Sequence, residues 1–341
     1  MKIRNIIRTN LKRSIVLFDY LTKWIPFPKI DILIISDFNG NQSALLEQFS
    51  DYKVKVIKYK TIKAYICAFY IRRAKVIYAD NINIAIASLK DIDGLVVQYW
   101  HATSAIKRFG LPTVTDQAEF NERKAEFVKY DVVTVNSNYM ADKFKLGFGI
   151  DDNKLSTVGC VQSQHMFQCP EIKPYFEYIV YVPTFRWNGK NDKKALEFIK
   201  NFHSDKYKLL YSLHPKVAEM IDNGDAIDIS GTDVRRYFEH AKLVISDYSS
   251  LLIDASLKCS NVVMYAYDAV EYTDDPGLYI DKSNFWGFYT EKDCELFDYI
   301  DSDNYVEHDT NFIKSEFFTY DDSDSVKRVA NLAKDYLQAA K

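Results

Sequence analysis

The segment Asp31-Ile-Leu-Ile-Ile-Ser36 decides the fold class, because it is a short, nearly all-apolar run rich in β-branched residues. A strand of this kind is buried on both faces, as in a parallel sheet covered by helices. A polar turn follows at 37–41, and a helix is expected to begin near Ser43. The same alternation continues along the chain and predicts further strands at 54–57, 74–78, 94–98, 132–135, 178–183, 208–213, 243–246 and 261–266.

Two α/β domains are expected from this pattern. A chain of 341 residues with 48% hydrophobic content is long enough for two buried cores at roughly 150 residues each. The periodicity breaks between about 160 and 177, a stretch that contains Pro170 and Pro174. We therefore expect a Rossmann-like domain over 29–165, a second one over 166–325 and a C-terminal helix over 326–341. Two doubly wound domains that face each other would bind ligands at the carboxyl ends of their strands.

The composition excludes several classes of protein. With 27% charged residues, 15% aromatic residues, 11 Gly and 8 Pro, the chain is neither disordered nor fibrous. Its five cysteines are scattered without zinc-ligand spacing, which indicates reduced thiols in a cytoplasmic protein. No apolar run approaches the roughly 20 residues of a membrane-spanning helix, and no signal peptide is recognisable. We predict no protein-held metal, no cofactor and no nucleic-acid partner, because no calcium-loop or nucleic-acid motif occurs.

The charge is distributed unevenly. Residues 271–341 hold 17 acids and 7 bases, so within a chain total of −3 the first 270 residues carry a net charge of +7. The first 25 residues form a basic amphipathic helix, with Arg4, Arg8 and Lys12 opposite a broad apolar face. This helix, within 1–28, is expected to lie on an anionic membrane surface at the inner face of the cell membrane. The alternative is a first helix that packs on the protein's own core.

Four polar clusters fall at expected strand ends. Two of them contain histidine, so His101 and His214 are predicted to face one cleft from opposite domains. The clusters are Tyr-Trp-His-Ala-Thr-Ser-Ala-Ile-Lys-Arg-Phe-Gly at 99–110, Pro-Thr-Phe-Arg at 183–186, Ser-Leu-His-Pro at 212–215 and Ser-Asp-Tyr-Ser-Ser-Leu-Leu-Ile-Asp at 246–254.

These clusters resemble the motifs of a known family. The segment W-H-A-T-S-A-I-K-R-F-G is similar to the W-H-G-T-P-x-K-x-x-G segment of the CDP-glycerol glycerophosphotransferases, the teichoic acid primases and polymerases of Gram-positive bacteria. The segments Y-V-P-T-F-R, L-H-P, S-D-Y-S-S-L-L-I-D and Y-A-Y-D-A-V-E-Y resemble later motifs of that family in order and spacing. The resemblance covers about residues 32 to 290. It implies a two-domain GT-B fold and transfer of glycerol phosphate, or a related polyol phosphate, from a CDP-polyol to a hydroxyl of a teichoic acid or other cell-surface glycan, with release of CMP.

The two histidines fit this chemistry. Phosphoryl transfer needs in-line positioning and positive charge or hydrogen-bond donors around the phosphates. His101 is the candidate general base, because an imidazole with a pKa of about 6.5 can take a hydroxyl proton near neutral pH. The alternative is a packed histidine beside Trp100 that donates to a carbonyl. His214 is expected to support the donor phosphates or the leaving group, or else to be a structural residue at a strand end.

The donor phosphates have further candidate ligands. Lys107, Thr184 and Arg186 are expected to bind them, and the planar guanidinium of Arg186 suits phosphate oxygens unless it forms a structural ion pair. Ser249 and Ser250 would present backbone N–H groups at the start of a helix, or would only cap it.

Two aspartates and three departures from the family pattern complete the set of candidate residues. Asp247 and Asp254 are expected to orient the ribose or a histidine, although Asp247 could equally be an N-cap. Ala102 and Ser104 replace the Gly and Pro of the family motif, and Gly-Cys-Val-Gln-Ser-Gln at 159–164 lacks the usual Arg. An alanine held at positive φ would cost on the order of 1 kcal/mol.

Two rival hypotheses are a GT-B glycosyltransferase that uses a sugar nucleotide and a non-catalytic, membrane-associated binding relative.

Overall fold

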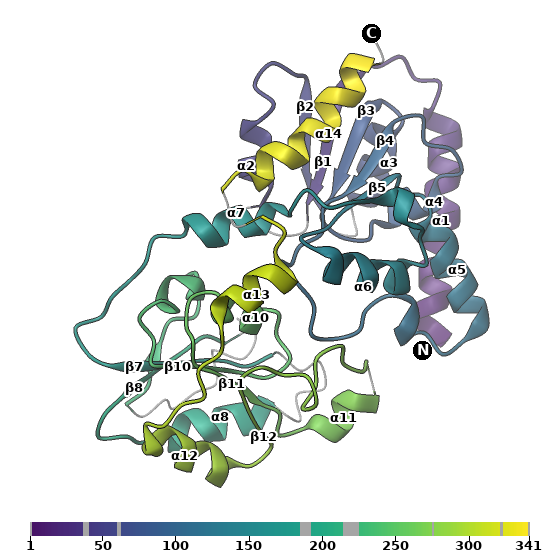
Figure 1. The fold of residues 1–341 in the computed structure, drawn as a ribbon. Helices are drawn as coiled ribbons and strands as arrows, with labels where there is room; N and C mark the ends of the chain where they lie inside the picture. Colours follow the sequence, from purple (N-terminus) through teal and green to yellow (C-terminus); the bar gives the residue numbers. More distant parts are fainter. Residues whose placement is uncertain are drawn as a thin grey trace. The chain divides into compact units, whose positions relative to one another are not determined.

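The computed structural model describes residues 2–36, 41–59, 63–184, 192–213, 225–274, 276–320 and 323–339. The chain divides into two compact units, each with its own six-stranded sheet and flanking helices (Figure 1). Unit 1 comprises Met1–Thr103, Gly110–Phe167 and Phe318–Lys341, and unit 2 comprises Ser104–Phe109 and Gln168–Phe317. The doubly wound α/β class predicted from the sequence is confirmed.

The sheet of unit 1 is parallel throughout, in the order β2-β1-β3-β4-β5-β6. Residues 32–36 are buried, as expected of a strand covered on both faces. The strand order reverses direction between β1 and β3, which makes that pair the topological switch point. The strands are β1 (Ile30–Ser36), β2 (Val54–Lys58), β3 (Ala74–Ala79), β4 (Leu95–Gln98), β5 (Val132–Thr134) and β6 (Leu155–Ser156).

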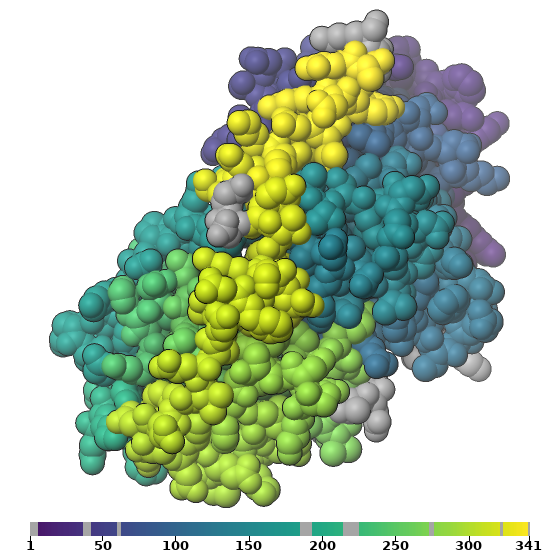
Figure 2. Space-filling model, viewed as in Figure 1, coloured from purple at the N-terminus to yellow at the C-terminus, as the bar shows by residue number. Residues whose placement is uncertain are grey.

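Helices cover both faces of this sheet. On one face, α2 and the C-terminal helix α14 pack against β1, β3 and β4 around Phe49, Tyr78 and Val329. The Tyr78 hydroxyl donates to the Val329 carbonyl at 2.7 Å, and Figure 2 shows α14 on the outside of unit 1. The helices of the unit are α1 (Lys2–Thr22), α2 (Asn41–Glu47), α3 (Ala64–Ile71), α4 (Ile84–Ser88), α5 (Gln117–Phe127), α6 (Asn138–Phe148), α7 (Val161–Gln168) and α14 (Ser325–Ala339), with 3₁₀ turns η2 (Leu111–Thr113) and η3 (Asp152–Lys154).

Helix α1 forms an outer layer on α3 and α4 (Figure 1). Its basic side faces the protein: Arg8 pairs with Glu126 at 2.5 Å, and Lys12 pairs with the same buried carboxylate. Asp19, one turn after the buried Ile15, pairs with Arg72. On this side, α1 packs on the protein as the alternative expectation had it, because a buried carboxylate on α5 pairs with both bases. No helix in the described ranges is long and apolar enough to cross a membrane.

The sheet of unit 2 is also parallel, in the order β12-β11-β10-β7-β8-β9, with its switch point between β7 and β10. Helices α8 and α12 cover one face, and α10 and α13 cover the other (Figure 1). The elements are β7 (Tyr178–Val182), α8 (Asp192–Asn201), β8 (Lys208–Tyr211), β9 (Ile227–Asp228), η4 (Val234–Tyr237), β10 (Leu243–Ser246), α10 (Leu251–Ser256), β11 (Val262–Tyr265), α11 (Ala269–Asp274), β12 (Phe288–Thr290), α12 (Asp293–Ser302) and α13 (Thr310–Phe317).

The division of the chain differs from the expected 29–165 and 166–325 in two places. Residues 104–109 belong to unit 2, where their backbone pairs with residues 277–280. Residues 318–320 and 323–324 belong to unit 1 together with α14, which completes the core of that unit. The described residues of both segments lie in loops, so they carry no helical or strand pattern from which the sequence could have revealed the division.

Candidate functional site

His101 lies in the loop after β4, at the carboxyl edge of the unit 1 sheet. Its Nδ1 is 3.0 Å from the carbonyl oxygen of Asp80, the residue that follows β3. A carbonyl only accepts, so the imidazole donates its Nδ1 proton and the lone pair of the neutral ring is on Nε2. Burial lowers the pKa of His101 from its ordinary 6.5, although the hydrogen bond to Asp80 opposes this. The lowered pKa favours the neutral ring at pH 7.

Asp80 and Ser36 support this loop and were not predicted from the sequence. Ser36 ends β1, and its hydroxyl donates to Oδ2 of Asp80 at 2.5 Å. Both residues are buried and lie at the switch point between β1 and β3, where ligands of doubly wound sheets bind. Their position as the first polar residues after two apolar strands is the signal that would have found them.

Trp100, rather than Ala102, adopts a positive φ in this loop. Trp100 has a φ of 54°, and Ala102 is not among the non-glycine residues with positive φ in the described ranges. The Trp100 ring packs on the His101 ring, with centroids 4.3 Å apart, and meets Phe144 edge to face. A left-handed tryptophan costs roughly 1–2 kcal/mol, which this packing offsets. The condition under which alanine at position 102 would be strained is therefore not met.

In unit 2, Asp247 joins the two strands of the switch point. Its carboxylate accepts from the Thr184 backbone N–H at 3.0 Å and from the Thr184 hydroxyl at 2.5 Å. It also accepts from the Tyr248 N–H at 2.6 Å. Thr184 lies two residues beyond β7 and Asp247 directly follows β10, so the predicted pair meets at the carboxyl edge of the sheet. Asp247 is only 1% exposed, and the N-cap position of α10 belongs to Ser250 rather than to Asp247.

The remaining predicted residues of the 246–254 cluster have mixed surroundings. Ser250 occupies its N-cap position without a side-chain cap bond, and the Ser249 hydroxyl accepts weakly from the Leu251 N–H at 3.3 Å. Asp254 is buried and accepts from Nε of Arg235 at 2.9 Å. Burial lowers the pKa of Arg235, but Asp254 and Asp233 outweigh this and raise it. Arg235 is thus a charged residue of the cluster that no sequence motif indicated.

Lys107 is part of unit 2, although it comes from the first half of the chain. Its backbone forms an antiparallel bridge with Leu278, and its Nζ lies 5.9 Å from the centre of the Tyr272 ring. The Tyr272 ring stacks on Tyr248 with centroids 4.1 Å apart. Tyr248 directly follows Asp247, so Lys107 belongs to the same cluster as Asp247 and Thr184.

Two predicted site residues, Arg186 and His214, lie outside the described residues. Their roles remain predictions from the sequence.

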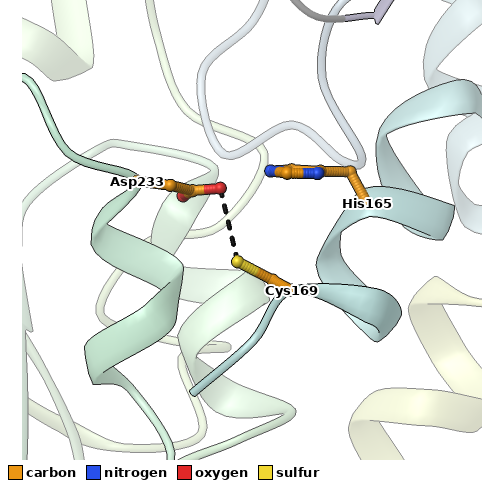
Figure 3. A group of neighbouring side chains, drawn as sticks. All are labelled: His165, Cys169 and Asp233. Atoms are coloured by element: carbon orange, nitrogen blue, oxygen red, sulfur yellow. Dashed lines mark hydrogen bonds between the residues drawn. The ribbon is translucent and has the colours of Figure 1, made fainter. Parts of the chain in front are cut away.

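None of the five cysteines forms a disulfide, as expected. Figure 3 shows Cys169, whose Sγ donates to Oδ2 of Asp233 at 3.5 Å, drawn together with His165 of α7. Burial, and after it the Asp233 carboxylate, raises the pKa of the Cys169 thiol to about 11. A thiol that stays protonated at neutral pH is a poor nucleophile, so Cys169 adds no reactive group to the site.

Comparison with known proteins places the chain in a family. The family model described as CDP-Glycerol:Poly(glycerophosphate) glycerophosphotransferase matches residues 34–334. The teichoic acid glycerol-phosphate primase of Bacillus subtilis (strain 168) is 25% identical over 331 residues, covering 82% of this chain and 84% of that protein. The primase of the same name from Staphylococcus aureus (strain NCTC 8325 / PS 47) is 29% identical over 244 residues, covering 65% of each chain.

The fold has solved counterparts as well. A structure of the wall teichoic acid polymerase TagF superposes with a TM-score of 0.72 at 18% identity, covering 99% of this chain and 96% of that one. This likeness shows a shared two-domain fold, as the resemblance had implied. Because the family model spans most of the sequence, the chain belongs to the CDP-glycerol:poly(glycerophosphate) glycerophosphotransferase family.

Proposed function

We propose that this protein transfers glycerol phosphate, or a related polyol phosphate, from a CDP-polyol to a hydroxyl of a teichoic acid or other cell-surface glycan, and releases CMP. The family match over residues 34–334 carries the proposal. The neutral imidazole of His101 at the carboxyl edge of a doubly wound sheet supports it, because this edge is where such sheets bind ligands.

The proposed reaction is a direct displacement at phosphorus. Nε2 of His101 takes the proton of the acceptor hydroxyl, and the acceptor oxygen forms a bond to the phosphorus that carries the polyol. The bond from that phosphorus to the bridging oxygen breaks, and CMP leaves with the electron pair. Charge builds up on the phosphate oxygens and the leaving group, where cations and N–H groups are most effective. We assign this task to Lys107, Arg186, His214 and the backbone around Ser249 and Ser250.

The test is CMP release by the purified protein with CDP-glycerol or CDP-ribitol and a lipid-linked acceptor. We expect release with at least one of the two donors, and only when acceptor is present. Failure with both donors would contradict the proposal. Consumption of a UDP-sugar instead would favour the glycosyltransferase hypothesis, and donor binding without turnover on any acceptor would favour the non-catalytic one.

We also propose that the protein binds the cytoplasmic face of the membrane through helix α1. Because the basic side of α1 faces Glu126, the opposite side is turned outward and is apolar. We call this side the outer face; its exposed apolar residues are Ile6, Ile7, Leu17, Tyr20 and Leu21 of α1 and Trp24 just beyond the helix, which are 59–79% exposed. An amphipathic helix with such a face lies in the membrane interface with its apolar side buried. The exposed bases Arg13 and Lys23 add attraction to anionic lipids.

Replacing Leu17 and Leu21 together with glutamine is expected to weaken binding to anionic vesicles at least tenfold. Burial of each leucine is worth about 1.5–3 kcal/mol, so the pair dominates the partition free energy. The measurement is sedimentation with phosphatidylglycerol-containing vesicles. Leu146→Gln is the matched control, because Leu146 is 57% exposed on α6, away from the outer face. Equal sedimentation of the double variant and the wild type would show that α1 belongs only to the fold.

A further inference from the structure

Lys107 is held in unit 2 by its backbone as well as by its side chain. The Arg108 N–H donates to the Gly277 carbonyl at 2.9 Å, and the Tyr279 N–H donates to the Ile106 carbonyl at 2.7 Å. These bonds flank the antiparallel bridge between Lys107 and Leu278. Lys107 therefore cannot slide along residues 277–279 without breaking hydrogen bonds on both sides.

The side chain of Lys107 meets the ring of Tyr272, which itself stacks on Tyr248. The ammonium lies 5.9 Å from the centre of the Tyr272 ring, within the range of a cation–π contact. Tyr272 stacks at 23° on Tyr248, which is fully buried and follows Asp247 in the chain. The Gly277 N–H donates to the Tyr272 carbonyl at 2.9 Å, so the ring and the backbone that pairs with Lys107 form one connected element.

Gly277 permits this close approach. It has a φ of +81°, and a Cβ added to it would lie 3.0 Å from Cδ of Arg108. Gly231 has a similar φ of +85°, but a Cβ there would meet no atom within 4 Å. The two glycines share the same conformational preference, and they differ in that only Gly277 lies against the segment that carries Lys107.

We propose that Tyr272 and Gly277 are positioning residues for Lys107, and that they set the place of its ammonium for the phosphates of a CDP-linked donor. This inference rests on the proposed function, because it takes the donor to be a cytidine diphosphate compound. A lysine carries a point charge on a flexible side chain. Contact with an aromatic face and attachment to a fixed backbone restrict this side chain before binding, so it loses less conformational entropy when it binds phosphate.

The test is the affinity for CDP-glycerol, measured by calorimetry in a set of variants. Lys107→Ala is expected to weaken binding roughly ten- to hundredfold, as for loss of a hydrogen bond to a charged group. Tyr272→Leu and Gly277→Ala are expected to weaken binding of CDP-glycerol roughly three- to tenfold, because the Lys107 ammonium keeps its charge but is no longer held in position. Tyr272→Phe keeps the aromatic ring, and Gly231→Ala leaves the contact between Lys107 and Tyr272 in place. Both variants should therefore bind CDP-glycerol as the wild type does.

The double variant Lys107→Ala/Tyr272→Leu separates positioning from a merely structural role. If Tyr272 acts through Lys107, the double variant binds no more weakly than Lys107→Ala alone, because the two effects are not additive. Additive losses, or weakening by Gly231→Ala equal to that of Gly277→Ala, would overturn the inference while leaving the proposed function intact. Absence of CDP-glycerol binding by the wild type would instead overturn the proposed function, and this inference with it.

Discussion

Replacing His101 with alanine is expected to lower the rate of CMP release roughly 10²–10⁴-fold, the usual contribution of a general base. The affinity for CDP-glycerol should change little, because the proposed role of His101 is toward the acceptor.

In the wild type, the base is active in its neutral form. Since burial lowers its pKa below the ordinary 6.5, activity should persist through pH 6.5 and fall only as the pH drops through the lowered pKa. The measurement is the pH dependence of the initial rate with saturating donor.

His165→Ala provides a comparison, because His165 is exposed on α7 and lies outside the family motifs. It should release CMP at the wild-type rate. Ser36→Ala should give a partial defect, since it removes the hydroxyl that holds the Asp80 carboxylate beside the His101 loop. Unchanged turnover in His101→Ala would remove this residue as the base and would favour the alternative, a packed histidine that donates to the Asp80 carbonyl.

The sheets were predictable because their strands are buried on both faces. Residues 32–36 are apolar up to Ser36 and all buried, so composition alone identified β1. Strands β6, β9 and β12 have only two or three residues, too few for a periodic signal, and were missed. The pairing of residues 104–109 with 277–280 was missed for a different reason. It is made by backbone groups, which every residue carries, and therefore leaves no trace in side-chain pattern.

The positions of the candidate site residues at the sheet edges were predictable where a sequence motif marks them. Asp247 directly follows β10 and His101 lies three residues after β4, and a polar residue soon after an apolar strand indicates the binding edge of a sheet. Asp80 holds His101 through its carbonyl oxygen, and Arg235 reaches Asp254 from a 3₁₀ turn that carries no motif. The faces of α1 were found by periodicity. Which face the protein covers depends on Glu126, more than 100 residues away in the chain, and no local pattern contains that information.

Replacing Asp247 with asparagine is expected to have the second large effect. The carboxylate accepts from two donors of Thr184 and from the Tyr248 N–H, whereas asparagine offers one acceptor oxygen and an amide that must donate. All three donors reach Oδ1, and the Thr184 N–H also reaches Oδ2 at 3.1 Å, where asparagine would place an amide group that donates. One donor facing that amide would lose its partner, at a cost of about 1–3 kcal/mol in the free energy of unfolding. Because the carboxylate fixes both strand ends of the switch point, CDP-glycerol affinity should fall at least tenfold. Urea denaturation and calorimetry measure the two effects separately.

Asp281→Asn is the matched control for this change. Asp281 also accepts from the N–H and the hydroxyl of one residue, Ser283, but it is exposed. Water can therefore accept any hydrogen bond from Ser283 that asparagine does not accept. We expect less than about 0.5 kcal/mol of destabilisation there and unchanged donor affinity. Thr184→Ser, which keeps the hydroxyl, should bind donor nearly as well as the wild type. If Asp247→Asn loses stability and still binds CDP-glycerol with wild-type affinity, the contacts of Asp247 at the switch point of unit 2 only stabilise the fold, and the donor binds elsewhere.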